Sequence, residues 1–196
     1  MIDETLIDRA LSGVPHLFDE IVPTATRPRA WSFYGEHWQW ALAREWASGP
    51  VMTFVMLNPS VATPYLRDTT DKRCEGFARR EQCAGMILVN LFAYRATQPS
   101  ALLTAAELGR DIVGRGNLQV IRAAAALSTT VVLAWGSGAA HPRLIGQARI
   151  VRGMLDESHV PTYRLGSKTG AGQPRHPCRL ASDIRLVPYS TRRSEQ

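Results

Sequence analysis

Residues 51–97 constrain the fold most strongly, because they contain two apolar strands that each lead directly into a polar cluster. The first strand reads VMTFVML and is followed by NPS, and the second reads MILV and is followed by NLFAYRAT. Open α/β sheets bind ligands at the carboxyl edge of their parallel strands. We therefore expect the two polar clusters to meet at one edge of a parallel sheet.

Strand and helix patterns alternate along the rest of the chain, beginning with an aromatic segment at residues 31–46. Apolar and polar residues alternate there with a period near two, which predicts a hairpin, and a helix over residues 36–48 is the competing interpretation. Further strands are expected at 51–57, 86–89, 129–135 and 162–165, and helices at 69–82, 101–108, 116–127 and 142–156. Gly85 is expected to end the first of these helices. This order predicts an α/β fold, namely a three-layer α/β/α sandwich with a mostly parallel central sheet plus an N-terminal hairpin.

A length of 196 residues suits one compact domain. We assign residues 30–190 to a single α/β domain. Residues 1–29 are interpreted as an appendage with a short amphipathic helix at 4–11 and a proline-bounded connector at 23–28. Residues 191–196 are expected to form a disordered tail.

The cysteines and the N-terminus indicate the cellular compartment. Three cysteines without a C-x-x-C pattern suit a reducing compartment. The N-terminus lacks a basic segment followed by an apolar one, and no apolar run approaches the roughly 18 residues of a membrane span. We therefore expect a soluble, cytoplasmic protein with no membrane partner.

The net charge of +6 comes almost wholly from arginine, since Lys72 and Lys168 are the only lysines among 23 basic residues. Guanidinium groups bind phosphate bidentately and stack on bases, so this bias favours a nucleotide or nucleic-acid partner. A genome rich in G and C, whose codons favour arginine, is the alternative explanation.

The first polar cluster consists of Asn58, Pro59 and Ser60. A proline at this point prevents further sheet pairing, so Asn58 is expected to lie over the sheet edge. An asparagine amide both donates and accepts hydrogen bonds, which suits contact with a base or with a water molecule. Asn-Pro-Ser is equally common as a simple turn.

Asp68 begins the helix that follows, and its default role is to cap that helix. A catalytic role for its carboxylate is the alternative, and Arg73 lies one turn into the helix, within reach of the same edge. A divalent metal held by Asp68 and Asp71 is a weaker interpretation. The chain has no zinc-ligand spacing, no Gly-x-Ser-x-Gly elbow and no P-loop, so we assign no metal and no cofactor.

Three polar residues, Asn90, Tyr94 and Arg95, follow the second strand. Tyr94 is expected to stack on a base, and Arg95 to bind a phosphate or the Asp68 carboxylate. Trp135 and Gly136 end the third strand in a turn of small residues, through which a ligand can approach backbone amides.

His176 lies between Arg175 and Pro177 after the last expected strand, which makes it the best candidate for acid–base chemistry or transition-state stabilisation. Arg175 is expected to lower the pKa of His176 and to favour neutral imidazole. A surface histidine without function remains the simpler alternative. The remaining histidines are interpreted as surface or loop residues, namely His16, His37, His141 and His159.

In this order the motifs resemble those of the bacterial and phage family called domain of unknown function 1643. The matching segments are LNPS at 57–60, the D-x-T-x-x-R-like segment at 68–73, VNLFAYRAT at 89–97, AWG at 134–136 and GQPRHP at 172–177. The resemblance covers roughly residues 30–182, and the family name implies no activity.

The same order is also similar, more distantly, to that of the uracil-DNA glycosylase superfamily. This resemblance implies a three-layer sandwich in which Asn58 orients water or the base, Asn90 contacts the base edge and His176 faces the leaving group. Two features depart from that pattern: Leu57 replaces a glycine, and Cys178-Arg179 replaces a serine-rich intercalating loop.

Two functions are therefore expected as alternatives. The first is a nucleobase- or nucleic-acid-binding enzyme that hydrolyses a base N-glycosidic bond, with catalytic Asn58, Asp68 and His176. The second is a non-catalytic module that binds a nucleotide or modified base. In either case the expected ligand contacts are Pro59, Ser60, Arg73, Asn90, Tyr94, Arg95, Trp135, Gly136 and Arg175.

Overall fold

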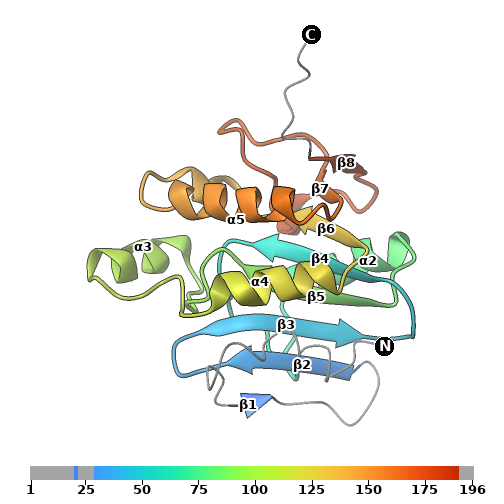
Figure 1. Ribbon diagram of the computed structural model, residues 1–196, viewed down its shortest axis with the longest axis horizontal. Coiled ribbons are helices and arrows are strands. Elements are labelled where there is room, and N and C mark those ends of the chain that lie inside the picture. Colours follow the sequence, from blue (N-terminus) through green and yellow to red (C-terminus); the bar gives the residue numbers. More distant parts are fainter. Residues whose placement is uncertain (1–19, 22–28, 190–196) are drawn as a thin grey trace.

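The computed structural model describes residues 20–21 and 29–189. The helix expected at 4–11, the connector and the tail lie outside the described residues. The strands are β1 (Glu20–Ile21), β2 (Arg29–Tyr34), β3 (Gln39–Glu45), β4 (Val51–Met56), β5 (Gly85–Asn90), β6 (Thr130–Leu133), β7 (Thr162–Leu165) and β8 (Leu186–Pro188). They form one mixed sheet in the order β1-β2-β3-β5-β4-β6-β7-β8 (Figure 1).

The centre of this sheet is parallel, and its two sides are antiparallel. β4 pairs in parallel with β5 and β6, and β6 pairs in parallel with β7. β3 and β8 flank this centre as antiparallel neighbours of β5 and β7. The expected mixed α/β fold with a mostly parallel centre is therefore confirmed.

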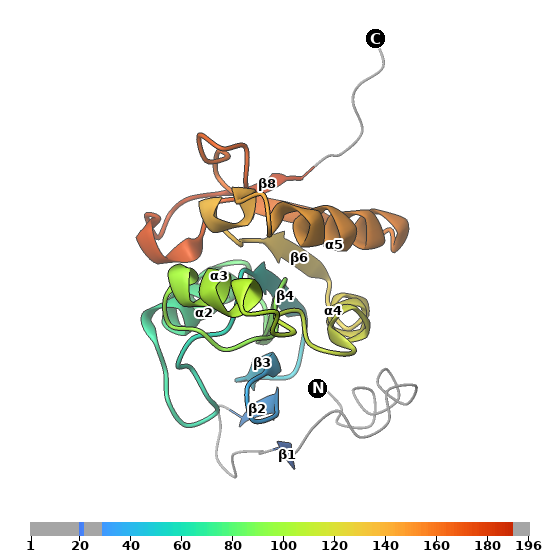
Figure 2. The same ribbon diagram turned by 90° about the vertical axis from the view of Figure 1, so that its left-hand side faces the viewer.

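Helices cover both faces of the sheet. The described helices are α2 (Thr69–Arg80), α3 (Pro99–Glu107), α4 (Asn117–Ala126) and α5 (Ile145–Glu157). Figure 2 shows α2 on one side of the central strands and α4 on the other. In Figure 1, α3 lies beyond the end toward which the arrow of β4 points. Within the described residues, no helix combines the length and apolar character needed to cross a membrane.

β4 supplies side chains to both cores, which explains why all six of its residues are buried. Met52, Phe54 and Met56 belong to the core that contains α2, while Val51 and Val55 belong to the core that contains α4 and α5. A central parallel strand covered on both faces needs such a continuous apolar run. The sequence pattern of residues 51–57 therefore has a direct structural cause.

The hairpin expected from the aromatic segment is confirmed, and the competing helix over 36–48 is wrong. β2 and β3 pair antiparallel, with Trp31 opposite Ala43 and Phe33 opposite Ala41. β3 also pairs with β5, so both of its edges are hydrogen-bonded, and all seven of its residues are buried. Pairing on both edges of the strand, together with burial of its side chains, overrides the local preference of Ala41–Glu45 for helix. Residues 20–21, which belong to the expected appendage, add β1 to the outer edge of β2.

Several element boundaries differ from the expectation. Helix α2 ends at Arg80, before Gly85, because Gln82 adopts a left-handed conformation and Gly85 already belongs to β5. Strand β6 ends at Leu133 and not at residue 135. The Ala134 N–H still donates to the Val55 carbonyl of β4, but the Gly136 N–H donates to Pro174 in another loop. Helix α5 begins at Ile145 because the 3₁₀ helix η1 (Ser137–Ala140) and a turn precede it. The short edge strand β8 was not expected, and its Pro188 is tolerated because it lies at the sheet edge.

A buried ion pair connects β3, α2 and the loop that joins β4 to α2. The Arg44 Nε donates to Asp71 Oδ1 at 2.6 Å, and the two side chains are 2% and 0% exposed. Arg67 donates to the other carboxylate oxygen at 2.5 Å. The remaining nitrogens of Arg44 donate to the backbone carbonyls of Thr63 and Pro64. Asp71 is thus a structural residue that holds the loop against the sheet.

We expect Asp71→Asn to lower the free energy of unfolding by about 3–5 kcal/mol, because buried Arg44 loses its counter-charge. Urea unfolding followed by circular dichroism measures this change. Glu81→Gln is the control, since its pair with Arg80 is partly exposed and contributes less than about 1 kcal/mol. A similar small loss in both variants would contradict the structural role of Asp71.

Candidate functional site

The order in which the chain adds strands to the sheet reverses between β4 and β6, because β5 lies on one side of β4 and β6 lies on the other. This switch point defines the candidate site. The loop after β4 leads to α2 on one face, whereas the loop after β6 leads through η1 to α5 on the other. The two loops therefore diverge and leave a crevice at the carboxyl ends of the two strands. Such crevices are the usual ligand sites of open α/β sheets.

A pocket of about 600 Å³ occupies this crevice, and we call it the main pocket. Its volume lies within the roughly 300–1,000 Å³ of small-molecule sites. The site residues expected from the sequence that line it are Asn58, Pro59, Ser60, Asp68, Asn90, Trp135, Gly136, Arg175 and His176. The polar clusters after β4 and β5 therefore meet, as expected, together with the loop that carries His176.

The loop of residues 169–177 is fixed to the end of β6 by two hydrogen bonds and by close packing at Gly136. The Gly136 N–H donates to the Pro174 carbonyl at 2.9 Å, and the Trp135 indole N–H donates to Gln173 Oε1 at 2.9 Å. Gly136 has φ +74° and ψ −177°, a conformation open essentially to glycine alone. A Cβ at Gly136 would lie 3.2 Å from the Cβ of His176. The close approach of these two backbone segments therefore places His176 in the main pocket.

His176 is held as a neutral imidazole with a defined donor. The backbone N–H of Cys178 donates to its Nδ1 at 3.3 Å, which leaves the proton on Nε2 in the neutral ring. Burial lowers the pKa of His176 below its ordinary value of 6.5, and the positive charge of Arg179 acts in the same direction. The Asp68 carboxylate opposes these effects. The pKa of His176 is therefore lowered, as expected. The cause differs from the expectation, because burial and Arg179 lower it and Arg175 does not contribute.

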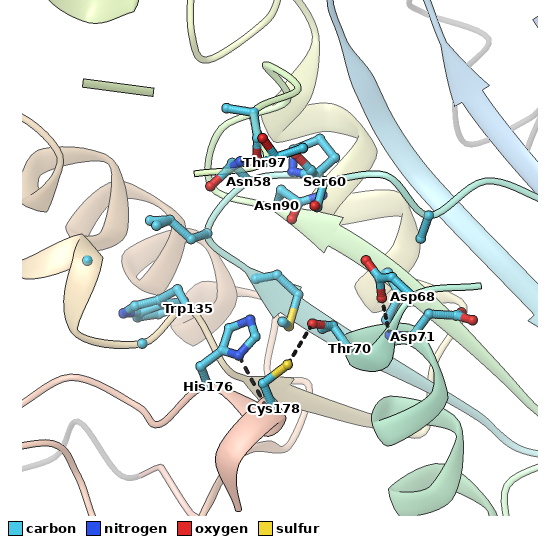
Figure 3. Close-up of a pocket in the computed structure, with 18 of the residues that line it drawn as sticks. Asn58, Ser60, Asp68, Thr70, Asp71, Asn90, Thr97, Trp135, His176 and Cys178 are labelled. Atoms are coloured by element: carbon cyan, nitrogen blue, oxygen red, sulfur yellow. Dashed lines mark hydrogen bonds between the residues drawn. The ribbon is translucent and has the colours of Figure 1, made fainter. Parts of the chain in front are cut away.

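Asn58 and Asn90 lie on the opposite side of the main pocket from His176 (Figure 3). Asn58 Nδ2 donates to the carbonyls of Pro59 and Ala96, so its Oδ1 is the atom left for a ligand. Asn90 is only 5% exposed. Within the described residues its side-chain amide has no hydrogen-bond partner, although it lines the main pocket. The Asn90 amide is therefore available for hydrogen bonds to a ligand in the pocket.

Asp68 caps α2, as expected. The N–H of Asp71 donates to Asp68 Oδ1 at 2.8 Å, and the other carboxylate oxygen remains available to a ligand or water. Both oxygens of Asp71 bind arginines, so the suggested metal site of Asp68 with Asp71 is not supported. Among the described residues, no group of three metal-binding side chains of the His, Cys, Asp or Glu type occurs.

Three residues expected to contact a ligand lie outside the main pocket. Arg73 donates to the Leu180 carbonyl and lies over the Phe77 ring, with 5.4 Å from its guanidinium carbon to the ring centroid. The Tyr94 hydroxyl accepts a hydrogen bond from Arg110 at 2.8 Å. Arg95 lines a separate, smaller pocket, so it does not meet Asp68. Proximity along the sequence was a poor guide for these side chains.

Several residues that line the main pocket were missed in the sequence. Thr70 is one of them, and its hydroxyl lies 3.2 Å from the Cys178 sulfur, which connects α2 to the His176 loop. Its position two residues after a helix cap was an available signal. The other missed polar residues are Gln39, Thr97, Ser137, Thr169, Cys178 and Arg179.

The family described as "Protein of unknown function (DUF1643)" matches residues 39–178. The chain belongs to this family. The resemblance inferred from the motifs is thereby confirmed, and the matched segment includes every expected site residue of this DUF1643 protein. No curated protein and no solved structure matches the chain, so its similarity to uracil-DNA glycosylases depends on motif order alone.

We expect His176 to titrate below 6.5 in the folded DUF1643 protein, as measured by NMR of its ring carbons and nitrogens. Asp68→Asn should lower this pKa further, and Arg179→Gln should raise it. Because the folded pKa is depressed, the contribution of His176 to stability is lost as pH falls from about 6.5 through the folded value. A pKa at or above 6.5 would contradict the burial of the ring.

We expect Gly136→Ala to destabilise the protein by about 1–3 kcal/mol, because alanine does not readily adopt this backbone conformation. The variant should also shift the NMR signals of His176, since the new Cβ meets that residue. Gly146→Ala is the matched control, as no atom lies within 4 Å of a Cβ at Gly146 and the residue is helical. Equal stability of the two variants would argue against the close packing at Gly136.

Proposed function

We propose that this DUF1643 protein binds an unpaired or extruded nucleobase in the main pocket and hydrolyses its N-glycosidic bond. The observation that carries the proposal is that Asn90, whose side-chain amide has no partner in the described chain, lies across one pocket from His176 (Figure 3). A nucleobase edge offers adjacent donors and acceptors, and an asparagine amide can match them with two hydrogen bonds.

The chemistry follows from His176 and Asp68. Cleavage breaks the bond between the sugar C1′ and the base nitrogen, and the electron pair leaves with the base. The Nε2–H of neutral His176 would donate a hydrogen bond to the base as this negative charge develops. Neutral imidazole suits this role, because burial already disfavours its protonated form.

Water completes the reaction. The free oxygen of Asp68, together with Asn58 Oδ1, would orient a water molecule toward C1′ and accept its proton. A C1′–O bond forms, and the proton removed from water finally protonates the departed base. The products are therefore the free base and a sugar that carries a hydroxyl group.

Charge at the mouth of the main pocket suits a phosphate backbone. Arg175 and Arg179 line the mouth with exposed side chains, and neither pairs with a carboxylate within the described chain. Arginines in this position favour a nucleotide or nucleic acid as partner. The free state of Cys74, Cys83 and Cys178 supports action in the cytoplasm. The uracil-DNA glycosylase-like fold is part of the same proposal, supported by the motif order.

The test is release of free base from single- and double-stranded oligonucleotides that contain uracil or modified bases. We expect His176→Ala to slow release by about 100-fold or more, the usual minimum for a residue of this kind. Asp68→Asn should also slow it, although asparagine caps helices as well as aspartate. His159→Asn, an exposed residue after α5, should retain full activity.

A non-catalytic module that binds a nucleotide or modified base is the second candidate. The observation that favours it is Asn58, which provides an amide after β4 where a catalytic base would carry a carboxylate. If the protein is such a module, we expect it to bind the oligonucleotides, more weakly at higher salt concentration, and to release no base. Full turnover in the His176 and Asp68 variants would contradict the enzymatic proposal instead.

A further inference from the structure

A second pocket of about 210 Å³ lies beside the main pocket. Gln39 lines both pockets, so the two are neighbours. Its Nε2 donates to Ser32 Oγ at 2.7 Å and to the Ala62 carbonyl at 3.2 Å, which fixes this buried side chain between β2 and the loop after β4. The other residues that line the second pocket are Ser32, Tyr34, Thr63, Pro64, Tyr65 and Arg95.

The loop between the two pockets presents large apolar side chains to solvent. Tyr65 is 72% exposed, Leu66 53% and Val61 41%. The loop is nevertheless held in place, because the Thr63 hydroxyl accepts hydrogen bonds from the N–H groups of Tyr65 and Leu66. Arg44 also binds the Thr63 carbonyl at 2.8 Å. An exposed aromatic ring on a rigid loop is suited to stacking against a flat partner.

Arg95 supplies a positive charge in the wall of the second pocket. Its backbone N–H donates to the His37 carbonyl at 2.9 Å, and the residue is half-buried. Within the described chain its guanidinium forms no ion pair. The second pocket therefore combines an aromatic ring with an arginine, the two groups that bind single-stranded nucleic acids.

We propose that the second pocket and Tyr65 hold the nucleotide adjacent to the one in the main pocket. Tyr65 stacks on the neighbouring base, and Arg95 binds the phosphate between the two nucleotides. This inference rests on the proposed function, and it names the substrate class as a nucleic-acid strand, not a free nucleoside. The net charge of +6 favours this polyanion over a protein partner.

The experiment measures binding of a fluorescently labelled single-stranded trinucleotide and of a mononucleotide by anisotropy. We expect the trinucleotide to bind more tightly than the mononucleotide. Tyr65→Ala should weaken trinucleotide binding about 5- to 150-fold, the range of base–aromatic stacking. It should leave mononucleotide binding unchanged, and Tyr65→Trp should restore the affinity.

Two further variants make the test specific. Arg95→Gln should lower the slope of log affinity against log salt by about 0.7, the value for one phosphate contact on a single strand. Leu108→Ala removes another exposed apolar side chain, 68% exposed at the end of α3, and should change nothing.

The outcomes separate this inference from the proposed function. Equal affinity for mononucleotide and trinucleotide, or unchanged trinucleotide binding in Tyr65→Ala, overturns the second subsite while the main pocket still binds its base. No binding of either probe overturns both proposals. Self-association that Tyr65→Ala abolishes, without a change in trinucleotide affinity, would assign the loop to a protein contact and overturn the nucleotide subsite.

Discussion

The ion pair between Arg44 and Asp71 is the interaction on which the rest of the site depends. It joins a strand on one side of the sheet to the first turn of α2, and Arg44 also binds two carbonyls of the intervening loop. A buried pair gains little net stability over an apolar contact, but it enforces one arrangement. Asp68 at the helix start and Tyr65 on the loop are both positioned by it. The polar side of the pocket is thus set by a buried charge pair.

The opposite side of the pocket depends on close backbone approach at Gly136. The chain leaves β6, turns at this glycine and binds the loop that carries His176. That loop is in turn connected to α2 through Cys178 and Thr70. The imidazole is therefore held from two directions, and its Nδ1 accepts a hydrogen bond from the Cys178 N–H.

The fold was largely predictable from residues 51–97, because a strand covered on both faces must be apolar along its whole length. The meeting of Asn58 and Asn90 followed from the ends of neighbouring parallel strands, whereas His176 is brought to them by the contacts of its loop with Trp135 and Gly136. The roles of Asp71, Arg73 and Tyr94 could not be predicted, because they depend on which distant carbonyl or charged group each side chain contacts. Tertiary packing sets these partners, and the local sequence pattern does not reveal them. The predicted ends of helices and strands were inaccurate for a related reason. Contacts at the end of β6, and the left-handed backbone of Gln82, override the local secondary-structure propensity.

The parallel pairing of β4 with both β5 and β6 has a consequence for how this protein reaches its native state. Val55 lies beside Leu133, so the central strand completes its pairing only after a long stretch of chain has been synthesised and collapsed onto it. Contacts so distant in sequence slow folding. The crevice between β4 and β6 forms at that step. The loop that carries His176 completes its wall, and this loop lies still further along the chain. A chain truncated before β6 therefore lacks two walls of the main pocket, namely the turn after β6 and the loop that carries His176.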